Sequence, residues 1–322
     1  MRTSTKSELL KQLEDSGGAF VSGGTLAALL GISRAAVWKA AEDLRAEGYG
    51  IEAATRKGYR LTAGSDRLSL HGIAPYLDSS LAGRIHIFDA VDSTNLTARE
   101  MLLSGAPPGT VILAEEQRRG RGRLGRDFFS PRTDSLYCSF ILTPPAGFRE
   151  AQMVTVAASV AVCWAAEKWT GCQCEIKWVN DIFVGGKKIC GILTEASADL
   201  EGGGVESLIL GVGVNINMGE ADFPEALRAA AGALSLPPGL RCRFAAELIR
   251  QVFAFCDGAG QPCIDEYRAR SCVVGKNIYV IQGDQKKEAE AVGINDSGNL
   301  LVRYPDGRTE TLYAGEISIR VR

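Results

Sequence analysis

Residues 116–126 restrict the folds that this chain can adopt. They include Gly120-Arg-Gly-Arg-Leu-Gly125, which matches the G-x-G-x-x-G pattern of dinucleotide-binding folds. That pattern requires a helix directly after the glycines, because the pyrophosphate lies at the helix N-terminus. Here an apparent strand, residues 110–114, precedes the glycines, and residues 127–131 lead into another apparent strand, residues 135–142. The sequence therefore excludes a dinucleotide-binding fold at this position.

The same stretch is rich in arginine and glycine, with five arginines and three glycines between Arg118 and Arg126. The arginine fork suits carboxylates and phosphates, and glycine lets backbone N–H groups approach an anion closely. We interpret the stretch as a loop that binds an anionic ligand. A solvated basic loop is the alternative.

The composition is that of a soluble globular protein, and it argues against a membrane span, secretion and a metal site. With 322 residues the chain has room for two or three domains, and the net charge of -2 means that any nucleic-acid contact must come from a local patch. We find no apolar run of 18 residues and no secretory signal, so we expect a cytoplasmic protein without a membrane span. The nine cysteines form no C-x-x-C pair and the two histidines lie far from them, which argues against a metal site and for reduced thiols.

Residues 1–64 have the pattern of a winged helix-turn-helix. Apolar spacing predicts a helix over residues 7–13, a short helix over 22–31 closed by Gly31, and a second helix over 34–47 capped by Ser33. Strand-like residues 50–54 and 58–62 then flank a basic tip, as in a β-hairpin wing. The second helix of such a unit enters the DNA major groove with its N-terminal residues.

We therefore expect this unit to bind operator DNA through outward-facing residues of the second helix and the wing. The candidates are Arg34, Ala35, Trp38, Lys39, Arg56 and Lys57, with Arg60 as a further phosphate contact. A helical hairpin that mediates dimerisation or merely packs remains the alternative.

The first polar motif of the central part is Asp92-Ser-Thr-Asn95. It lies between an apparent strand, residues 84–88, and an apparent helix, residues 95–103. Ser93 and Thr94 could simply cap that helix. Hydroxyls and an amide at such a turn are also what a neutral polar ligand needs. A long apolar helix, residues 151–169, follows later and is expected to be core.

A second group of motifs lies between residues 175 and 217. Residues 175–184 are predicted to be one strand that exposes Asn180 and Asp181, and Gly185-Gly186 is a hairpin turn. In the returning strand, residues 187–195, alternation places Lys188, Cys190 and Ile192 on one face, opposite Lys187, Ile189 and Gly191, so one lysine can point inward. In the next strand, residues 206–217, the glycines permit close approach of a flat ligand and Asn215 offers a polar edge suited to a purine.

The C-terminal residues 269–322 contain five short strand-like segments, residues 275–281, 287–294, 300–304, 309–313 and 316–321. Turns at residues 283–284, 296–298 and 306–307 separate them. The pattern predicts a small SH3-like β-barrel. It could be no more than a structural cap.

Five motifs occur in the order and spacing of biotin protein ligases: residues 92–95, 120–126, 177–181, 186–195 and 211–215. With the helix-turn-helix in front, nearly the whole chain resembles the bifunctional biotin–[acetyl-CoA-carboxylase] ligase and biotin operon repressor. The resemblance implies an α+β protein with three domains. These are a winged helix-turn-helix (1–64), a central mixed α/β ligase domain of the biotin/lipoate ligase type (67–268) and the SH3-like domain (269–322), which in the family assists ATP and acceptor binding.

The resemblance also implies residue roles. Biotin would be bound by Ser93, Thr94, Asn95, Gln117, Arg121, Gly122, Arg123 and Lys188. The adenylate or ATP would be bound by Gly120, Arg123, Asn180, Lys188, Gly191, Gly211, Gly213 and Asn215. The catalytic residues would be Lys188 and Arg123, with Asp181 orienting the incoming amine. The sequence indicates no magnesium ligands.

The activity implied by the resemblance has two steps, which use ATP and Mg²⁺. Biotin is activated to biotinyl-5′-AMP with release of pyrophosphate, and is then transferred to a lysine of a biotin carboxyl carrier protein. The arginine loop would be mobile without ligand and close over it. The ligand-bound chain would form a homodimer that represses transcription at operator DNA.

The chain departs from the family pattern at two positions, and two alternative functions stay open. Val179 stands where the family often has proline, and Phe128 stands where a tryptophan often follows the arginine loop. One alternative is a repressor whose biotin-sensing domain lacks catalysis. The other is a relative of the lipoate ligases.

Overall fold

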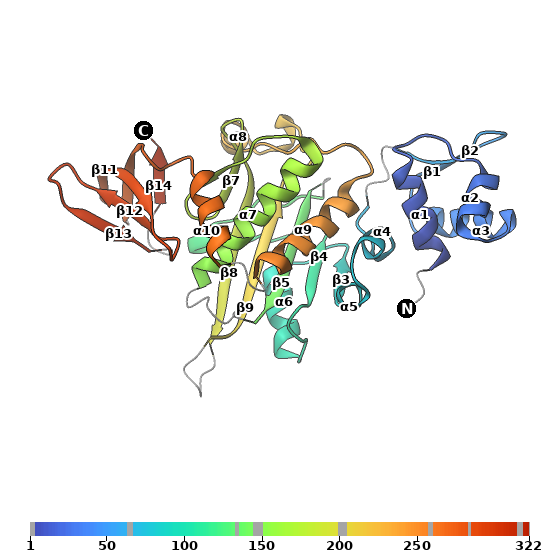
Figure 1. The fold of residues 1–322 in the computed structure, drawn as a ribbon, viewed down its shortest axis with the longest axis horizontal. Coiled ribbons are helices and arrows are strands. Elements are labelled where there is room, and N and C mark those ends of the chain that lie inside the picture. Colours follow the sequence, from blue (N-terminus) through green and yellow to red (C-terminus); the bar gives the residue numbers. More distant parts are fainter. Residues whose placement is uncertain are drawn as a thin grey trace.

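The computed structural model describes residues 4–62, 67–132, 135–143, 151–198, 205–256, 260–282, 285–313 and 318–321. Three parts follow one another along the long axis of the molecule (Figure 1): the N-terminal helices, a central sheet with its helices, and a C-terminal sheet. The expected linker at residues 63–66 and the turn at 283–284 lie outside the described residues.

The N-terminal part is a helical unit with a two-stranded hairpin. Its elements are α1 (Thr5–Asp15), α2 (Gly23–Leu30), α3 (Arg34–Ala46), β1 (Ile51–Ala54) and β2 (Gly58–Leu61). Ser22 and Ser33 accept first-turn N–H groups of α2 and α3, and Gly31 ends α2 with a φ of 64°. Helix, turn, helix and hairpin thus occur in the order predicted for a winged helix-turn-helix.

The central part is built on a seven-stranded sheet with strand order β3-β4-β5-β9-β8-β7-β6. The strands are β3 (Ile85–Phe88), β4 (Val111–Ala114), β5 (Leu136–Leu142), β6 (Glu175–Lys177), β7 (Asp181–Val184), β8 (Lys187–Ala198) and β9 (Val205–Val214). The β3–β4 pair is parallel, and the other pairs are antiparallel. The sheet is therefore mixed, as expected for the central domain.

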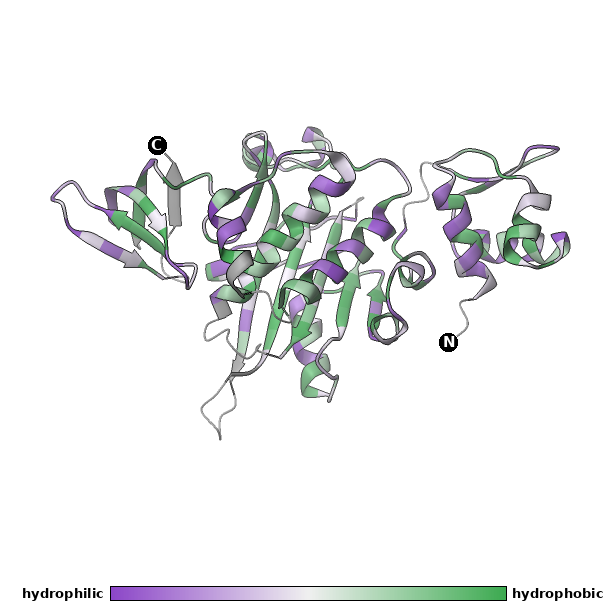
Figure 2. Ribbon diagram, viewed as in Figure 1, coloured by the Kyte–Doolittle hydropathy of each residue, from purple (hydrophilic) through white to green (hydrophobic). Residues whose placement is uncertain are grey.

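Helices cover both faces of the central sheet. One face packs against α7 (Ala151–Thr170), α9 (Arg241–Cys256) and α10 (Gly260–Ala269), and the other against α6 (Thr94–Leu103). Alternating residues of β4 divide accordingly, with Leu113 in the large core and Ile112 in the α6 cluster. The strands are largely green in Figure 2, as expected for a sheet buried on both faces. The short elements are α4 (Leu70–Ile73), η1 (Ala74–Tyr76), α5 (Ser79–Ala82), η2 (Arg123–Gly125), η3 (Glu220–Asp222) and α8 (Glu225–Arg228).

One predicted strand is wrong. Residues 175–184 form two short strands, β6 and β7, which pair antiparallel with Lys177 opposite Asp181, so residues 178–180 are a turn. The turn is stable because its groups find partners outside the sheet. Trp178 and Val179 are buried, Tyr267 Oη donates to the Val179 carbonyl at 2.8 Å, and Trp178 Nε1 donates to the Gly298 carbonyl at 2.8 Å.

The C-terminal part is a five-stranded antiparallel sheet with strand order β13-β12-β11-β10-β14. Its strands are β10 (Asn277–Gln282), β11 (Gln285–Ile294), β12 (Leu300–Arg303), β13 (Thr309–Leu312) and β14 (Ser318–Val321). Five short strands were predicted here, and five are present among the described residues.

Polar contacts hold the N-terminal unit against the central part. Tyr76 Oη donates to Glu14 Oε2 at 3.0 Å, and Arg67 Nη1 donates to the Glu47 carbonyl at 3.0 Å. Leu68, directly after Arg67, donates its N–H to the buried Glu115 at 2.8 Å, and Glu115 pairs with the buried Arg241 at 2.8 Å. The start of the central part is thus fixed by an internal ion pair.

Candidate active site

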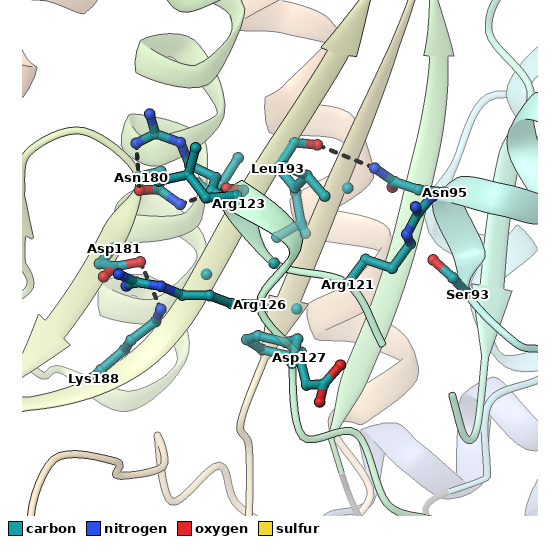
Figure 3. A pocket seen from close by; sticks show the side chains of 18 of the residues that line it. Ser93, Asn95, Arg121, Arg123, Arg126, Asp127, Asn180, Asp181, Lys188 and Leu193 are labelled. Carbon is teal, nitrogen blue, oxygen red and sulfur yellow. Dashed lines mark hydrogen bonds and ion pairs between the residues drawn. The ribbon is translucent and has the colours of Figure 1, made fainter. Parts of the chain in front are cut away.

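A cavity of about 320 Å³ opens on the central sheet. It is lined by the start of α6, the loop between β4 and β5, the β6–β7 turn, and strands β8 and β9. Figure 3 shows Ser93, Asn95 and Arg121 on one side and Asn180, Asp181 and Lys188 on the other. Five lining side chains are basic and two are acidic: Arg121, Arg123, Arg126, Lys177 and Lys188 against Asp127 and Asp181. The cavity is therefore suited to an anion.

The start of α6 supplies a neutral, buried, hydrogen-bonded end of the cavity. Ser93 occupies the N-cap position but makes no side-chain capping bond. Thr94 N and Oγ1 donate to Gln117 Oε1 at 2.8 and 3.0 Å. Asn95 Nδ2 donates to Glu195 Oε2 at 2.8 Å, and Ser139 Oγ lies 2.6 Å from Asn95 Oδ1. These side chains are therefore held in place before any ligand binds.

The arginine loop is itself a small hairpin. Gly122 N donates to the Arg126 carbonyl at 2.7 Å, Phe128 N donates to the Gly120 carbonyl at 2.8 Å, and Arg121 and Asp127 form a β-bridge. A Cβ on Gly120 would lie 2.2 Å from the Phe128 carbonyl oxygen, so only glycine fits there. Among the described residues from this loop to β5, the only helical element is the three-residue η2, which agrees with exclusion of the dinucleotide-binding fold.

The charged end of the cavity is organised around one ion pair and one arginine. Lys188 Nζ lies 2.7 Å from Asp181 Oδ1, and Arg123 Nη1 donates to Asn180 Oδ1 at 3.3 Å. Burial lowers the pKa of Arg123, and the nearby Asp181 carboxylate partly offsets this. Since both basic groups line the cavity, they can neutralise a ligand's negative charge.

The predicted alternation of faces along β8 is wrong. Lys188 and Gly191 were placed on opposite faces, but both line the cavity, and a Cβ on Gly191 would lie 3.3 Å from Lys188 Nζ. The cause is a register shift in the β7–β8 pair, where Cys190 and Lys188 face successive residues of β7 and Ile189 is skipped. Lys187 points elsewhere and pairs with Glu220 at 3.2 Å.

Three glycines form the floor of the cavity. A Cβ on Gly213 would lie 2.4 Å from the Phe128 ring, and one on Gly191 would lie 3.0 Å from it. A Cβ on Gly211 would lie 2.2 Å from Asn95 Oδ1. The aromatic ring of Phe128 thus lies on Gly213, one of the two glycines of β9 where a flat ligand was expected, and also on Gly191 of β8. At the other β9 position, Gly211 lets Asn95 approach the sheet.

Two predicted ligand-binding residues do not line the cavity. Gly120 packs inside the arginine loop, and Asn215 is buried with its Nδ2 donating to the Gly232 carbonyl at 3.0 Å. The other predicted biotin, adenylate and catalytic residues all line the cavity. Gln117 lines it and also holds Thr94 by hydrogen bonds.

The predicted DNA-binding residues lie at the surface of the N-terminal unit. Ala35, Trp38 and Lys39 are exposed on α3, and Arg34 lies over α2, where a Cβ on Gly24 would be 2.8 Å from its Nη2. In the wing, Arg56 and Lys57 are exposed at the tip. Arg60 pairs with Glu52 across the hairpin at 2.6 Å, and both Lys57 and Arg60 lie over the Phe20 ring.

Sequence analysis missed several residues that build the site. Ser139 is fully buried in β5 and touches both Thr94 and Asn95. Ser130 accepts from Gln117 Nε2 at 2.9 Å, and Glu195 fixes Asn95 from β8. A serine in the otherwise apolar strand β5 was the available signal. The side chains that face it come from distant segments and could not be identified.

Two negative findings apply to the described part of the chain. No group of three or more histidine, cysteine, aspartate or glutamate side chains there could hold a metal ion. No helix there is long and apolar enough to cross a membrane.

Three family models match the chain. The biotin/lipoate A/B protein ligase family matches residues 87–215, a helix-turn-helix domain matches residues 5–60, and the biotin protein ligase C-terminal domain matches residues 273–320. The cavity lies almost wholly within the first match. Fold and site together define a ligase of the biotin/lipoate class with a DNA-binding domain in front.

Full-length relatives narrow this class. The bifunctional ligase/repressor BirA of Bacillus spizizenii is 34% identical and covers 99% of this chain and 100% of its own length. BirA of Escherichia coli is 28% identical and covers 94% of each chain. The structure of biotin protein ligase from Aquifex aeolicus in complex with biotin and ATP matches with a TM-score of 0.63 and 26% identity, over 74% of this chain and 99% of that one. The chain belongs to the biotin protein ligase family, in its bifunctional ligase/repressor branch, which confirms the resemblance of the motifs.

Proposed function

We propose that the cavity binds biotin and ATP side by side and joins them as biotinyl-5′-AMP. The chain is an ATP-dependent biotin protein ligase of the bifunctional repressor type. One observation carries the assignment of this activity to the cavity. A single space offers preorganised neutral polar groups on one side, with Arg121 beside them, and four further basic side chains in the rest of its lining.

The neutral end suits the ureido ring of biotin, which carries donors and an acceptor but no charge. We assign Ser93 and Thr94 to direct contact with the ring. Thr94, Asn95 and Gln117 already bond to protein groups, so they act at least partly by holding the start of α6 in place. Preorganised side chains lose little entropy when a ligand binds.

The charged end fits the first reaction. An oxygen of the biotin carboxylate attacks the α-phosphate of ATP, forming the acyl–phosphate bond while the bond to pyrophosphate breaks. Because two anions must meet, neutralisation of charge is the main requirement. Lys188 and Arg123 are assigned this role, and Arg121 and Arg126 of the loop are placed to assist.

The cavity lining contains two carboxylates, Asp127 and Asp181, which lie apart, so one of them would hold a magnesium ion that ATP brings with it. An ion held mainly by phosphates needs only one or two protein carboxylates, which fits the lack of a larger ligand cluster among the described residues. Such an ion supplies charge neutralisation at the phosphates.

In the second reaction, a lysine amine of a biotin carboxyl carrier protein attacks the acyl carbon, and AMP leaves. We assign Asp181 to orientation of that amine. Its partner Lys188 lies 2.7 Å away, so release of this ion pair when the phosphate engages Lys188 would free the carboxylate.

The N-terminal unit is assigned to operator DNA, bound as a ligand-induced homodimer. We assign phosphate contacts to Arg34, Lys39, Arg56 and Lys57. We further propose domain boundaries at 1–64, 67–268 and 269–322, and a cytoplasmic location, where ATP and carrier proteins are available and the free cysteines stay reduced.

A biotin-transfer assay with ATP, Mg²⁺ and a carrier domain tests the proposal. Lys188→Ala and Arg123→Ala should each lower transfer by at least 100-fold, the size expected when a transition-state charge loses its partner. Lys187→Ala is the matched control, since the neighbouring lysine pairs with Glu220 outside the cavity. Equal activity of the Lys187 and Lys188 variants would contradict the assignment.

The same assay separates the alternatives. A repressor without catalysis would bind biotin but release no pyrophosphate from ATP. A lipoate ligase relative would activate lipoate in preference to biotin. We favour biotin because the start of α6 presents a buried, uncharged set of hydrogen-bonding side chains.

A further inference from the structure

The recognition helix α3 carries an exposed indole. Trp38 is 57% exposed, although its neighbours Val37, Ala40 and Ala41 are buried in the core of the unit. Ala35 lies three residues earlier and Lys39 directly after, so all three share the outward face of the helix. The helix therefore presents a small apolar strip, formed by Ala35 and Trp38, near its N-terminus.

The charged side chains around this strip are basic near the start of α3 and acidic further along the helix. Lys39 lies beside it on α3, and Arg34, which precedes Ala35, lies over the start of α2. Acidic side chains begin only one turn further along, at residues 42 and 43. An apolar strip flanked by cations fits a polyanion that offers an apolar group between its charges.

Duplex DNA offers one such group. In the major groove, the edges of adenine, guanine and cytosine are polar, whereas thymine presents its C5-methyl group. Alanine and aromatic side chains contact this methyl in direct readout. We infer that Trp38, supported by Ala35, contacts thymine methyl groups in the operator and so determines part of its sequence. This inference rests on the DNA-binding function proposed above.

Selection and base substitution test the inference. The full chain with biotinyl-5′-AMP would first enrich a duplex from a random pool. Each thymine of that duplex is then replaced by uracil, which removes only the methyl group. Wild type should lose about fourfold in affinity per contacted methyl, the transfer free energy of one such group. Trp38→Ala should bind the thymine duplex more weakly and no longer distinguish uracil.

Controls make the result specific. Trp38→Phe keeps an apolar ring and should keep the preference for thymine, and Leu29→Ala, which removes an exposed side chain of α2, should leave it unchanged. Thermal unfolding checks that each variant is folded. Failure to enrich any duplex would refute the DNA-binding function itself. An enriched duplex that wild type binds equally well with thymine or uracil would refute only the role of Trp38, as would a Trp38→Ala variant that still prefers thymine.

Discussion

Single residues on β8 and β9 decide what can enter the cavity. Gly191 and Gly213 leave room for the ring of Phe128, which lies on the floor in this structure. A nucleotide base that enters the same place must displace the ring or stack upon it. The absence of side chains on the floor is therefore as important for binding as the presence of Lys188 beside it.

We predict that Gly213→Ala raises the KM for ATP by about tenfold. The added Cβ would lie 2.4 Å from the Phe128 ring, and overpacking of this kind costs roughly 1–3 kcal/mol. Steady-state kinetics with varied ATP would measure the effect. Gly293→Ala is the control, because the nearest atom to its new Cβ is 3.9 Å away. An unchanged KM for ATP would show that the floor does not receive the nucleotide.

Sequence reasoning identified most residues of the cavity but not how they are held. The motifs were visible because glycines, arginines and polar turns stand out locally. Lys188 could not be separated from Lys187, because the register shift at Ile189 depends on the pairing of β8 with β7. The position of Asn215 outside the cavity lining was not predictable, for a related reason. Its amide bonds to Gly232, in a loop whose path no local pattern indicates.

At the scale of elements, the C-terminal sheet reaches the cavity through one turn. The Gly298 carbonyl, between β11 and β12, accepts hydrogen bonds from Trp178 Nε1 and Gln152 Nε2. Trp178 precedes Asn180 and Asp181 in the β6–β7 turn, and it lines the cavity itself. The sheet therefore positions the charged end of the site rather than only capping the chain.

Trp178→Phe should lower kcat/KM for ATP by about fivefold to tenfold, since it removes one buried hydrogen bond and leaves the Gly298 carbonyl without that donor. The KM for biotin should change little, because biotin is assigned to the opposite end. Trp164→Phe, at an exposed position of α7, is the matched substitution. Equal kinetics for the two variants would mean that the contact does not position the turn.

Glu247 of α9 pairs with Lys168 of α7, and the contribution of this carboxylate to the stability of the fold depends on pH. Burial alone would raise the pKa of Glu247, but hydrogen bonds from Gln251, Arg250 and Lys168 outweigh it and hold the pKa below its usual value of 4.5. A lowered pKa in the folded state means that the carboxylate stabilises the fold above pH 4.5 and loses this effect as pH falls through the lower, folded value.

Glu247→Gln should therefore lower Tm at pH 7 by about 1–2 °C, the shift expected for a loss of roughly 1 kcal/mol in a protein of 322 residues. The gap between wild type and variant should narrow as the pH falls below 4.5. Calorimetric scans from pH 7 down to about pH 3 would measure it, since the folded-state pKa lies below 4.5. A gap that stays constant or widens in acid would contradict the cause given for the lowered pKa.

Elements were predictable where local signals act alone. Gly31 ends α2 and Ser33 begins α3 by capping, which needs no tertiary information. The single strand predicted over residues 175–184 was wrong because its turn is stabilised by Tyr267 and Gly298, both far along the chain. Period-two patterns cannot show where a buried segment leaves the sheet.

The whole molecule joins DNA-binding and ligand-binding parts by fixed contacts. Arg67 bridges the Glu47 carbonyl and Asp89, and the Glu115–Arg241 pair holds Leu68 where the central part begins. Glu115 stands two residues before Gln117, which holds Thr94 in the cavity. A series of contacts therefore runs from the N-terminal unit to the cavity.

We predict that biotinyl-5′-AMP lowers the dimer dissociation constant by about tenfold or more, a coupling typical of linked sites. Ligand that favours the dimer must also bind the dimer more tightly. Sedimentation velocity over a range of protein concentrations, with and without the adenylate, would detect the shift. Identical dimer dissociation constants with and without the adenylate would contradict a ligand-induced dimer.

Pyrophosphate release in a single turnover tests the central claim most directly. The chain would be mixed with ATP, Mg²⁺ and either biotin or lipoate, without any acceptor protein. We predict a burst of about one pyrophosphate per chain with biotin, little with lipoate, and loss of the burst in Lys188→Ala but not in Lys187→Ala. A chain that binds biotin and DNA but releases no pyrophosphate would contradict the account and leave a ligand-responsive repressor.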